Sequence, residues 1–142
     1  MDRILRIATI LLGILFALGG VYGVWGFHYE WLATFAGLIV VTILVVWRGG
    51  PRAFSAGLRA GILFRIWSPL LEALMFSTYQ THNPDLVHRF DVVSVERTLL
   101  TGLVAVLVFG FLVAVFSVVV KRARAVPPET QETETEVRPQ NK

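Results

Sequence analysis

Four polar side chains recur on one face of an otherwise apolar segment: Arg65, Ser68, Glu72 and Tyr79, at spacings of three, four and seven residues. A carboxylate within a membrane-spanning helix is costly, and it is usually paired or functional. Pro69 has no N–H, so the carbonyl of Arg65 loses its helical donor and we expect a kink there. An inward acid beside a kink is typical of a proton or cation path. Glu72 is therefore a candidate transport site, with the other three side chains around it.

The same stripe has a plainer interpretation, in which a protonated or hydrogen-bonded Glu72 only holds helices together. Alternatively, the whole segment lies at the membrane interface and its carboxylate is in contact with water. None of the other predicted spans contains a charged residue that could act with Glu72. The stripe therefore predicts packing more strongly than transport.

Imidazole and carboxylate side chains recur every three residues after this segment, at His82, Asp85, His88 and Asp91. Such groups bind transition metals, so His82 and His88 are candidates for an extracytoplasmic metal or ligand site. A three-residue step drifts around a helix, however, and solvated residues of a surface helix explain the pattern better. Haem ligation would need a histidine inside a span, and no predicted span contains one. We expect no cofactor.

Pairs of small residues four positions apart accompany the apolar segments. Such pairs let helix backbones approach closely where lipid supplies no hydrophobic drive for association. We therefore expect a tightly packed bundle that forms a homo-oligomer or joins a larger membrane complex. The pairs are Gly19 and Gly23, Ala33 and Gly37, Gly57 and Gly61, and Gly110 and Ala114.

The composition indicates that these residues lie in a lipid environment. The chain has 142 residues, 55% of them hydrophobic and 16% charged, and a mean hydropathy of +0.66. A soluble domain has about 25% charged residues, so a water-soluble enzyme and a disordered chain are excluded. The absence of cysteine excludes a disulfide scaffold.

No phosphate-binding loop, nucleophile elbow or zinc-protease motif is present, so we expect no enzyme. No basic cluster interleaved with aromatic residues indicates nucleic-acid binding.

Apolar length defines the spans that position these residues. A helix needs about 20 residues to cross the hydrocarbon core of a bilayer. The segment 61–79 is long enough but marginal, because it carries Arg65, Pro69 and Glu72. In this span Glu72 would lie near mid-membrane. Three further segments qualify without a charged residue: 7–25, 31–47 and 98–120.

Basic residues decide whether 61–79 crosses the membrane. If it lies in the interface, the chain has three spans and its C-terminal end is external. Lys121, Arg122 and Arg124 directly follow the most apolar span, however, and basic residues there favour the cytoplasmic side. We therefore predict four spans with both termini in the cytoplasm. The basic N-terminus and the first apolar residues also resemble a signal peptide, but the apolar run continues to Trp25, which favours a retained helix.

The remaining segments are polar. Asn83 and Pro84 form a typical helix start, and the apolar residues after them recur at helical spacing. We predict a short extracytoplasmic amphipathic helix over 84–96, before the last span. The segment 127–142 begins with two prolines and is rich in Glu and Thr, so we expect a disordered cytoplasmic tail. The transmembrane domain then occupies residues 1–126.

These patterns together predict an all-α membrane protein, a four-helix transmembrane bundle with one surface helix and a tail. Eleven arginines against two lysines are typical of a GC-rich genome, so we place the chain in a prokaryotic plasma membrane. We expect a non-catalytic accessory or scaffold subunit that acts through helix packing. Its partners would be the lipid bilayer and a second copy or another membrane protein. The alternatives are a proton- or ion-coupled transport component that uses Glu72, and a metal or ligand sensor that uses His82 and His88.

Overall fold

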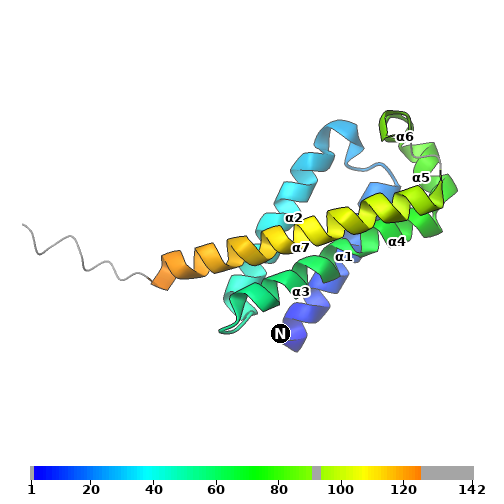
Figure 1. Cartoon of the computed structure of the whole chain (residues 1–142). Coiled ribbons are helices and arrows are strands. Elements are labelled where there is room, and N and C mark those ends of the chain that lie inside the picture. Colours follow the sequence, from blue (N-terminus) through cyan, green and yellow to red (C-terminus); the bar gives the residue numbers. More distant parts are fainter. Residues whose placement is uncertain (1, 91–93, 126–142) are drawn as a thin grey trace, which may run out of the picture.

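Helices account for nearly all of the described chain. The computed structural model describes residues 2–90 and 94–125, and these residues form helices and turns but no strand. The predicted all-α class is confirmed for this part of the chain. Its helices, in chain order (Figure 1), are α1 Arg3–Val21, α2 Gly26–Arg48, α3 Ala53–Arg65, α4 Trp67–Leu74, α5 Phe76–His82, α6 Pro84–Phe90 and α7 Val95–Ala125.

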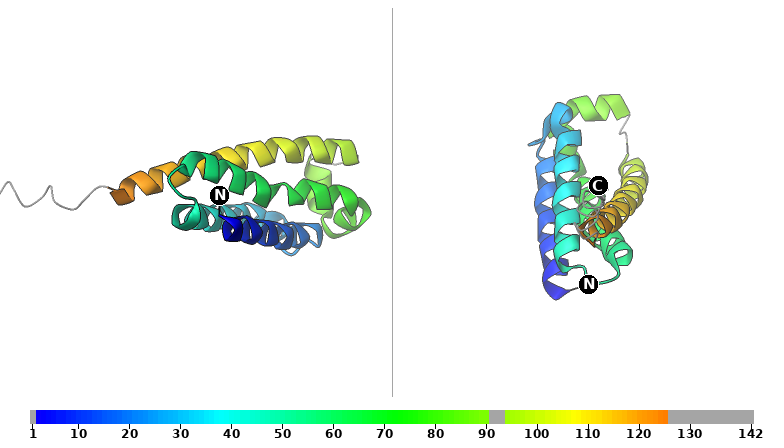
Figure 2. Two further views of the ribbon diagram at one scale, coloured as in Figure 1. Left: turned by 90° about the horizontal axis from the view of Figure 1, so that it is seen from below. Right: turned by 90° about the vertical axis from the view of Figure 1, so that its left-hand side faces the viewer.

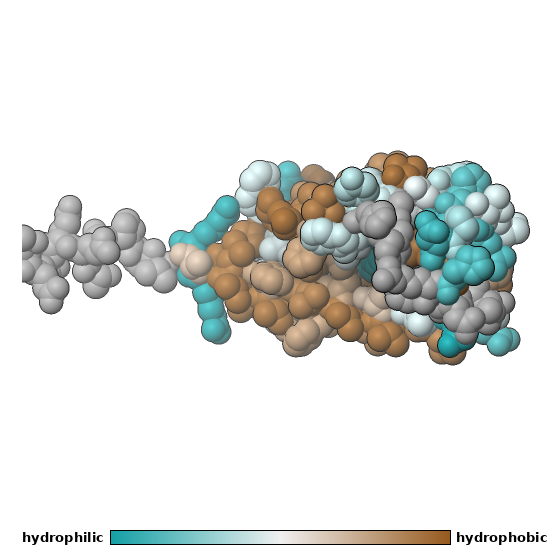
Figure 3. Space-filling model, turned by 90° about the horizontal axis from the view of Figure 1, so that it is seen from above, coloured by the Kyte–Doolittle hydropathy of each residue, from teal (hydrophilic) through white to brown (hydrophobic). Residues whose placement is uncertain are grey.

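Three of the described helices are long and apolar enough to cross a membrane: α1, the part of α2 over Tyr29–Arg48, and α7. A fourth crossing is present if Ala53–Leu74, which comprises α3 and α4, is counted with α5 as one bent span. The helix axis turns by 94° between these two parts. Figure 3 shows an apolar band along the bundle, with hydrophilic residues gathered toward its ends. Such a band is the surface that a hydrocarbon layer would cover.

Helices α3 and α4 together form the central element of the bundle. They pack against α7 on one side and α1 on the other, and α2 contacts both α3 and α7 (Figure 2). The ring of Phe64 in α3 stacks on that of Phe109 in α7 at 5.4 Å, and it lies 5.3 Å from that of Phe16 in α1. These rings fill the middle of the bundle. The buried core comprises Leu5, Leu38, Val41, Val45, Ala56, Ala60, Phe64, Phe109 and Val113.

The third apolar helix lies earlier in the sequence than predicted. It runs through Ala53–Leu74 instead of 61–79, because a helix that starts directly after the Gly-Gly-Pro breaker can bury its small residues against α7. Met75 leaves the helical conformation, with φ −110° and ψ 36°. The residues after Met75 are mostly polar. A polar segment is more stable outside an apolar layer than within it, so the chain turns away at this point. The helix is also interrupted at Ile66, within one turn of Pro69, where a kink was expected.

The first helix ends four residues before the predicted boundary. Gly23 has φ +65°, a left-handed conformation that glycine adopts without strain. Its N–H donates to the carbonyl of Gly20 at 3.1 Å, and the N–H of Val24 donates to that of Gly19 at 2.9 Å. These two bonds are the Schellman arrangement that closes a helix C-terminus. The turn is short, so α2 begins at Gly26, five residues earlier than predicted.

The predicted amphipathic helix over 84–96 is divided in two. Its first part is α6, and its last residues open α7. The hydroxyl of Ser94 accepts from the N–H of Arg97 at 3.2 Å, which caps α7 and so separates it from α6. The residues between these helices and the predicted tail over 127–142 lie outside the described residues.

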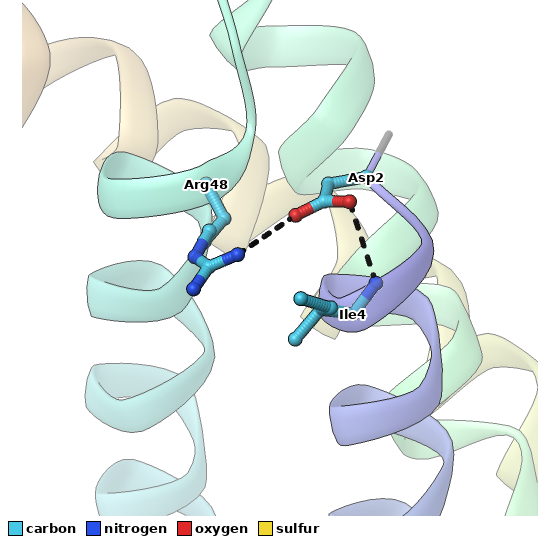
Figure 4. Close-up of polar contacts among 3 residues, drawn as sticks. All are labelled: Asp2, Ile4 and Arg48. Atoms are coloured by element: carbon cyan, nitrogen blue, oxygen red, sulfur yellow. Dashed lines mark hydrogen bonds and ion pairs between the residues drawn. The ribbon is translucent and has the colours of Figure 1, made fainter.

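One end of the bundle is closed by contacts between distant parts of the chain. The carboxylate of Asp2 lies 3.1 Å from the guanidinium of Arg48 and accepts from the N–H of Ile4 (Figure 4). The hydrogen bond from Arg48 holds the pKa of the Asp2 carboxyl below its usual range. The ammonium of Lys121 donates to the carbonyl of Gly50, which joins the end of α7 to the α2–α3 turn. We call this the basic end, after Arg48, Arg52, Lys121, Arg122 and Arg124.

Candidate functional site

Side chains from six helices line a cavity of about 440 Å³ toward the end of the bundle opposite the basic end. Its charged groups are the carboxylates of Glu30 and Glu72 and the guanidinium groups of Arg65 and Arg97. Two acids and two arginines balance in formal charge. We call it the Glu72 cavity, lined by Glu30, Arg65, Glu72, Tyr79, Leu86, Arg97, Thr98, Thr101, Gly102 and Ala105.

Arg65 and Ser68, two members of the predicted stripe, are bonded to each other. Nη1 of Arg65 donates to Oγ of Ser68 at 3.0 Å, and the guanidinium lies over the ring of Phe16, 5.3 Å from its centroid. Ser68 is buried at this contact. Arg65 lies near the middle of Ala53–Leu74 and also lines the Glu72 cavity. The cavity therefore reaches from the end of the bundle opposite the basic end toward the middle of the bundle, where the ring of Phe16 lies.

Glu72 lies near the end of Ala53–Leu74, whereas the sequence predicted a place near the middle of its helix. It precedes the 94° turn at Met75 by three residues, because the crossing helix begins earlier than expected. Beside it is a smaller cavity of about 20 Å³, which is room for about one water molecule. Tyr79 is buried and lines both cavities together with Glu30 and Glu72. Among the described residues, Glu72 and Arg65 form no ion pair with each other.

Asn83 holds the corner between α5 and α6 against α1. Its Nδ2 donates to the carbonyls of Gly20 at 3.1 Å, Val21 at 3.2 Å and Tyr79 at 3.1 Å. The sequence predicted Asn83 only as the start of a helix, whereas its buried amide also satisfies the last carbonyls of α1 and one of α5. The amide thereby fixes the segment that carries Tyr79 into the cavity.

Glu30 and Arg97 are cavity residues that sequence reasoning did not identify. Each lies one residue outside a predicted span, before 31–47 and 98–120, where a charge is ordinarily taken as interfacial. Both predicted spans start at the end of the bundle that carries the polar residues of α5. Glu30 and Arg97 could have been identified as charged residues that directly precede a predicted span at the end of the bundle nearer to Glu72.

The two candidate metal ligands lie on different helices, His82 at the end of α5 and His88 on α6. Nδ1 of His82 is 2.9 Å from the carbonyl of Thr78, one turn earlier in α5, and its ring lies edge-on to that of Tyr22. His88 is exposed on α6. The described residues, which do not include Asp91, contain no group of three His, Cys, Asp or Glu side chains that could hold a metal. The geometry of this part of the chain therefore does not support a metal site.

Two of the predicted small-residue pairs meet each other where α3 crosses α7. A Cβ added to Gly57 would lie 2.8 Å from the Cα of Ala114. One added to Gly61 would lie 2.7 Å from the Cα of Gly110. Only small residues allow two helix backbones to approach this closely. These four positions are therefore occupied by packing within the chain.

The other two pairs have different surroundings. Gly19 lies against the ring of Trp25, and Gly23 forms the turn after α1. Gly37 and Ala33 lie beside an apolar groove of about 290 Å³ between α1 and α2. We call this the α1–α2 groove, lined by Leu12, Leu15, Phe16, Trp25, Ala33, Ala36, Gly37, Val40 and Phe64.

The comparisons with known proteins add no functional information. No family model, no curated protein and no solved structure matches the chain. The Glu72 cavity, the α1–α2 groove and the basic end are the features of the described residues that bear on function.

Proposed function

We propose that this chain is a multi-pass protein of a prokaryotic plasma membrane that acts as a non-catalytic accessory or scaffold subunit. The apolar helices support a membrane location. The proposal counts Ala53–Leu74 as a crossing, so that the chain spans four times. The preference of basic residues for the cytoplasm supports placing the basic end, and with it the N-terminus and the C-terminal end of α7, on that side. The Glu72 cavity then lies toward the outer side.

The α1–α2 groove is the observation that carries the accessory role. Small residues allow a further helix to approach closely, and two of the four predicted pairs are already used inside the bundle, between α3 and α7. The groove keeps a volume of about 290 Å³ between two helices, with Ala33 half-buried and Ala36 exposed at its edge. Its lining is apolar, as a neighbouring transmembrane helix requires. A helix of a second copy or of another membrane protein fits this surface.

Ala36→Trp in the full chain tests the accessory role. A tryptophan at this exposed position would fill the groove, so the amount of partner that co-purifies in mild detergent is expected to fall by about tenfold or more. Val104→Trp is the matched control, because Val104 is 62% exposed on α7 and does not line the groove. A parent protein that is a clean monomer in native mass spectrometry contradicts the proposal, as does an equal loss in both variants.

A proton- or ion-coupled transport component is the second candidate, and the Glu72 cavity favours it. A half-buried carboxylate beside a water-sized void can exchange a proton with the outer side. The lining of the cavity includes no residue of the basic end, and its innermost charge, Arg65, lies over Phe16. Transport by this route would therefore need a further protein or copy, which agrees with an accessory role in a complex.

Glu72→Gln tests the second candidate. Glutamine keeps the size of the side chain but cannot exchange a proton, so a pH-dependent flux into reconstituted vesicles is expected to disappear. Glu96→Gln is the matched control, because Glu96 is exposed at the start of α7 and does not line the cavity. A flux that survives in Glu72→Gln, or no flux from the parent protein with its partner present, rules the candidate out.

A further inference from the structure

At the basic end, α3 and α7 border an open pocket that neither proposed role uses. It has a volume of about 570 Å³ and lies where α3 begins and α7 leaves its apolar stretch. Three cationic side chains line it, from Arg52, Lys121 and Arg122. No acidic side chain of the described residues does so. The pocket therefore combines a concentrated positive charge with a position at the edge of the apolar band.

The positive charge of this pocket is not neutralised within the described residues. Neither Arg52 nor Arg122 forms an ion pair there, and Lys121 donates to the neutral carbonyl of Gly50. The carboxylate of Asp2 is engaged by Arg48, which lies outside the pocket. The first N–H groups of α3 also point away from their own helix, and no side chain caps them. All of these groups attract an anion.

The pocket also has an apolar part that continues onto the outer surface of the bundle. Phe54 lines the pocket and is 46% exposed. Its ring packs edge-to-face on that of Phe111 in α7, with centroids 6.3 Å apart, and Phe111 is exposed as well. A ligand of this pocket can therefore place an anionic group among the three cations and a hydrocarbon chain along the two rings. A phospholipid has these two parts in this order, whereas a free phosphate has only the first.

We propose that this pocket binds the headgroup of an anionic phospholipid, with an acyl chain against Phe54 and Phe111. The proposal rests on the membrane placement proposed above but not on the accessory role or on Glu72. Basic residues near the cytoplasmic leaflet attract its anionic lipids, and a basic pocket between helices selects individual headgroups. Such a lipid bridges the start of α3 and the end of α7.

Native mass spectrometry of the full chain, released from nanodiscs of mixed phosphatidylglycerol and phosphatidylcholine, tests the proposal. The double variant R52Q/R122Q is expected to retain about tenfold less phosphatidylglycerol, with phosphatidylcholine unchanged. R6Q/R124Q is the matched control. Arg6 lies one turn after Asp2 in α1, Arg124 belongs to the basic end, and neither lines the pocket. The control removes the same charge, so its retention is expected to stay within about twofold of the parent protein. Circular dichroism checks that both variants keep their helix content.

Three outcomes would overturn the lipid site. Equal loss in the two double variants would mean that net charge alone attracts the lipid. Displacement of the lipid by millimolar inorganic phosphate would indicate a site for soluble anions. Binding that appears only after removal of residues 127–142 would mean that the acidic tail of the chain occupies the pocket. If only the accessory role is wrong, native mass spectrometry would show a monomer that still retains phosphatidylglycerol.

Discussion

Replacement of Gly61 by leucine is expected to lower the free energy of unfolding by about 3 kcal/mol or more. A Cβ at this position would already lie 2.7 Å from the Cα of Gly110, and a backbone atom cannot rotate out of the way. The same Cβ would lie 3.2 Å from the side chain of Val113, so the rest of the leucine has no space either. Helices α3 and α7 must therefore separate, and their contact is the most extensive in the bundle.

Titration with SDS in mixed micelles, followed by tryptophan fluorescence, measures this change. Gly61→Ala is expected to give a smaller loss, because the better helix propensity of alanine offsets about 1 kcal/mol. Gly20→Ala is the matched control, since a Cβ there would meet only a carboxylate oxygen of Glu72 at an ordinary 3.9 Å. Its stability is expected to stay equal or to rise slightly. If Gly61→Leu behaves like Gly20→Ala, the two backbones are not in contact.

Replacement of Asn83 by alanine is expected to cost about 1–3 kcal/mol of unfolding free energy. The two N–H groups of the amide are shared among the carbonyls of Gly20, Val21 and Tyr79, and the amide is buried. Alanine would leave the carbonyl of Val21 without this donor in a site that water reaches poorly, whereas the carbonyls of Gly20 and Tyr79 keep their backbone donors. The α5–α6 corner should detach from α1, so hydrogen exchange in α5 and α6 is expected to accelerate more than elsewhere.

Thr81→Ala is the matched control for Asn83→Ala. The Thr81 hydroxyl is exposed and bonds only the carbonyl of Ser77 in its own helix, at 2.8 Å. Its removal is expected to change stability by less than about 0.5 kcal/mol. Equal exchange rates in the two variants would contradict the anchoring role of Asn83.

The apolar helices could be predicted because length and hydrophobicity suffice to identify them. The third begins eight residues before the predicted start, because Arg52 and Arg59 interrupt the apolar pattern ahead of Gly61. Its true start at Ala53 depends on packing, since Ala53, Gly57 and Gly61 form a buried small-residue face against α7. At Ser94, where α7 begins, the predicted helix over 84–96 also shows a local capping bond, accepted by the Ser94 hydroxyl, that periodicity does not reveal.

The candidate site could be predicted only in part, because some of its residues come together through the packing of separate helices. Helical spacing placed Glu72 and Tyr79 on one face, and the structure brings both to one cavity. Glu30 and Arg97 come from other helices, so their approach depends on the order in which the helices pack. The close contact of Gly102 with Pro69 was also missed, because no second small residue lies four positions away to mark it.

A crossing by Ala53–Leu74 would place the basic end and the Glu72 cavity on opposite sides of the membrane, and single cysteines test this most directly. The native chain has no cysteine, so Pro51→Cys, Asp85→Cys and Ala125→Cys each create one reactive site. A membrane-impermeant maleimide is expected to label position 85 in intact cells, and positions 51 and 125 only after permeabilisation. Labelling of positions 51 and 85 from the same side would mean that Ala53–Leu74 does not cross, which contradicts the four-span arrangement.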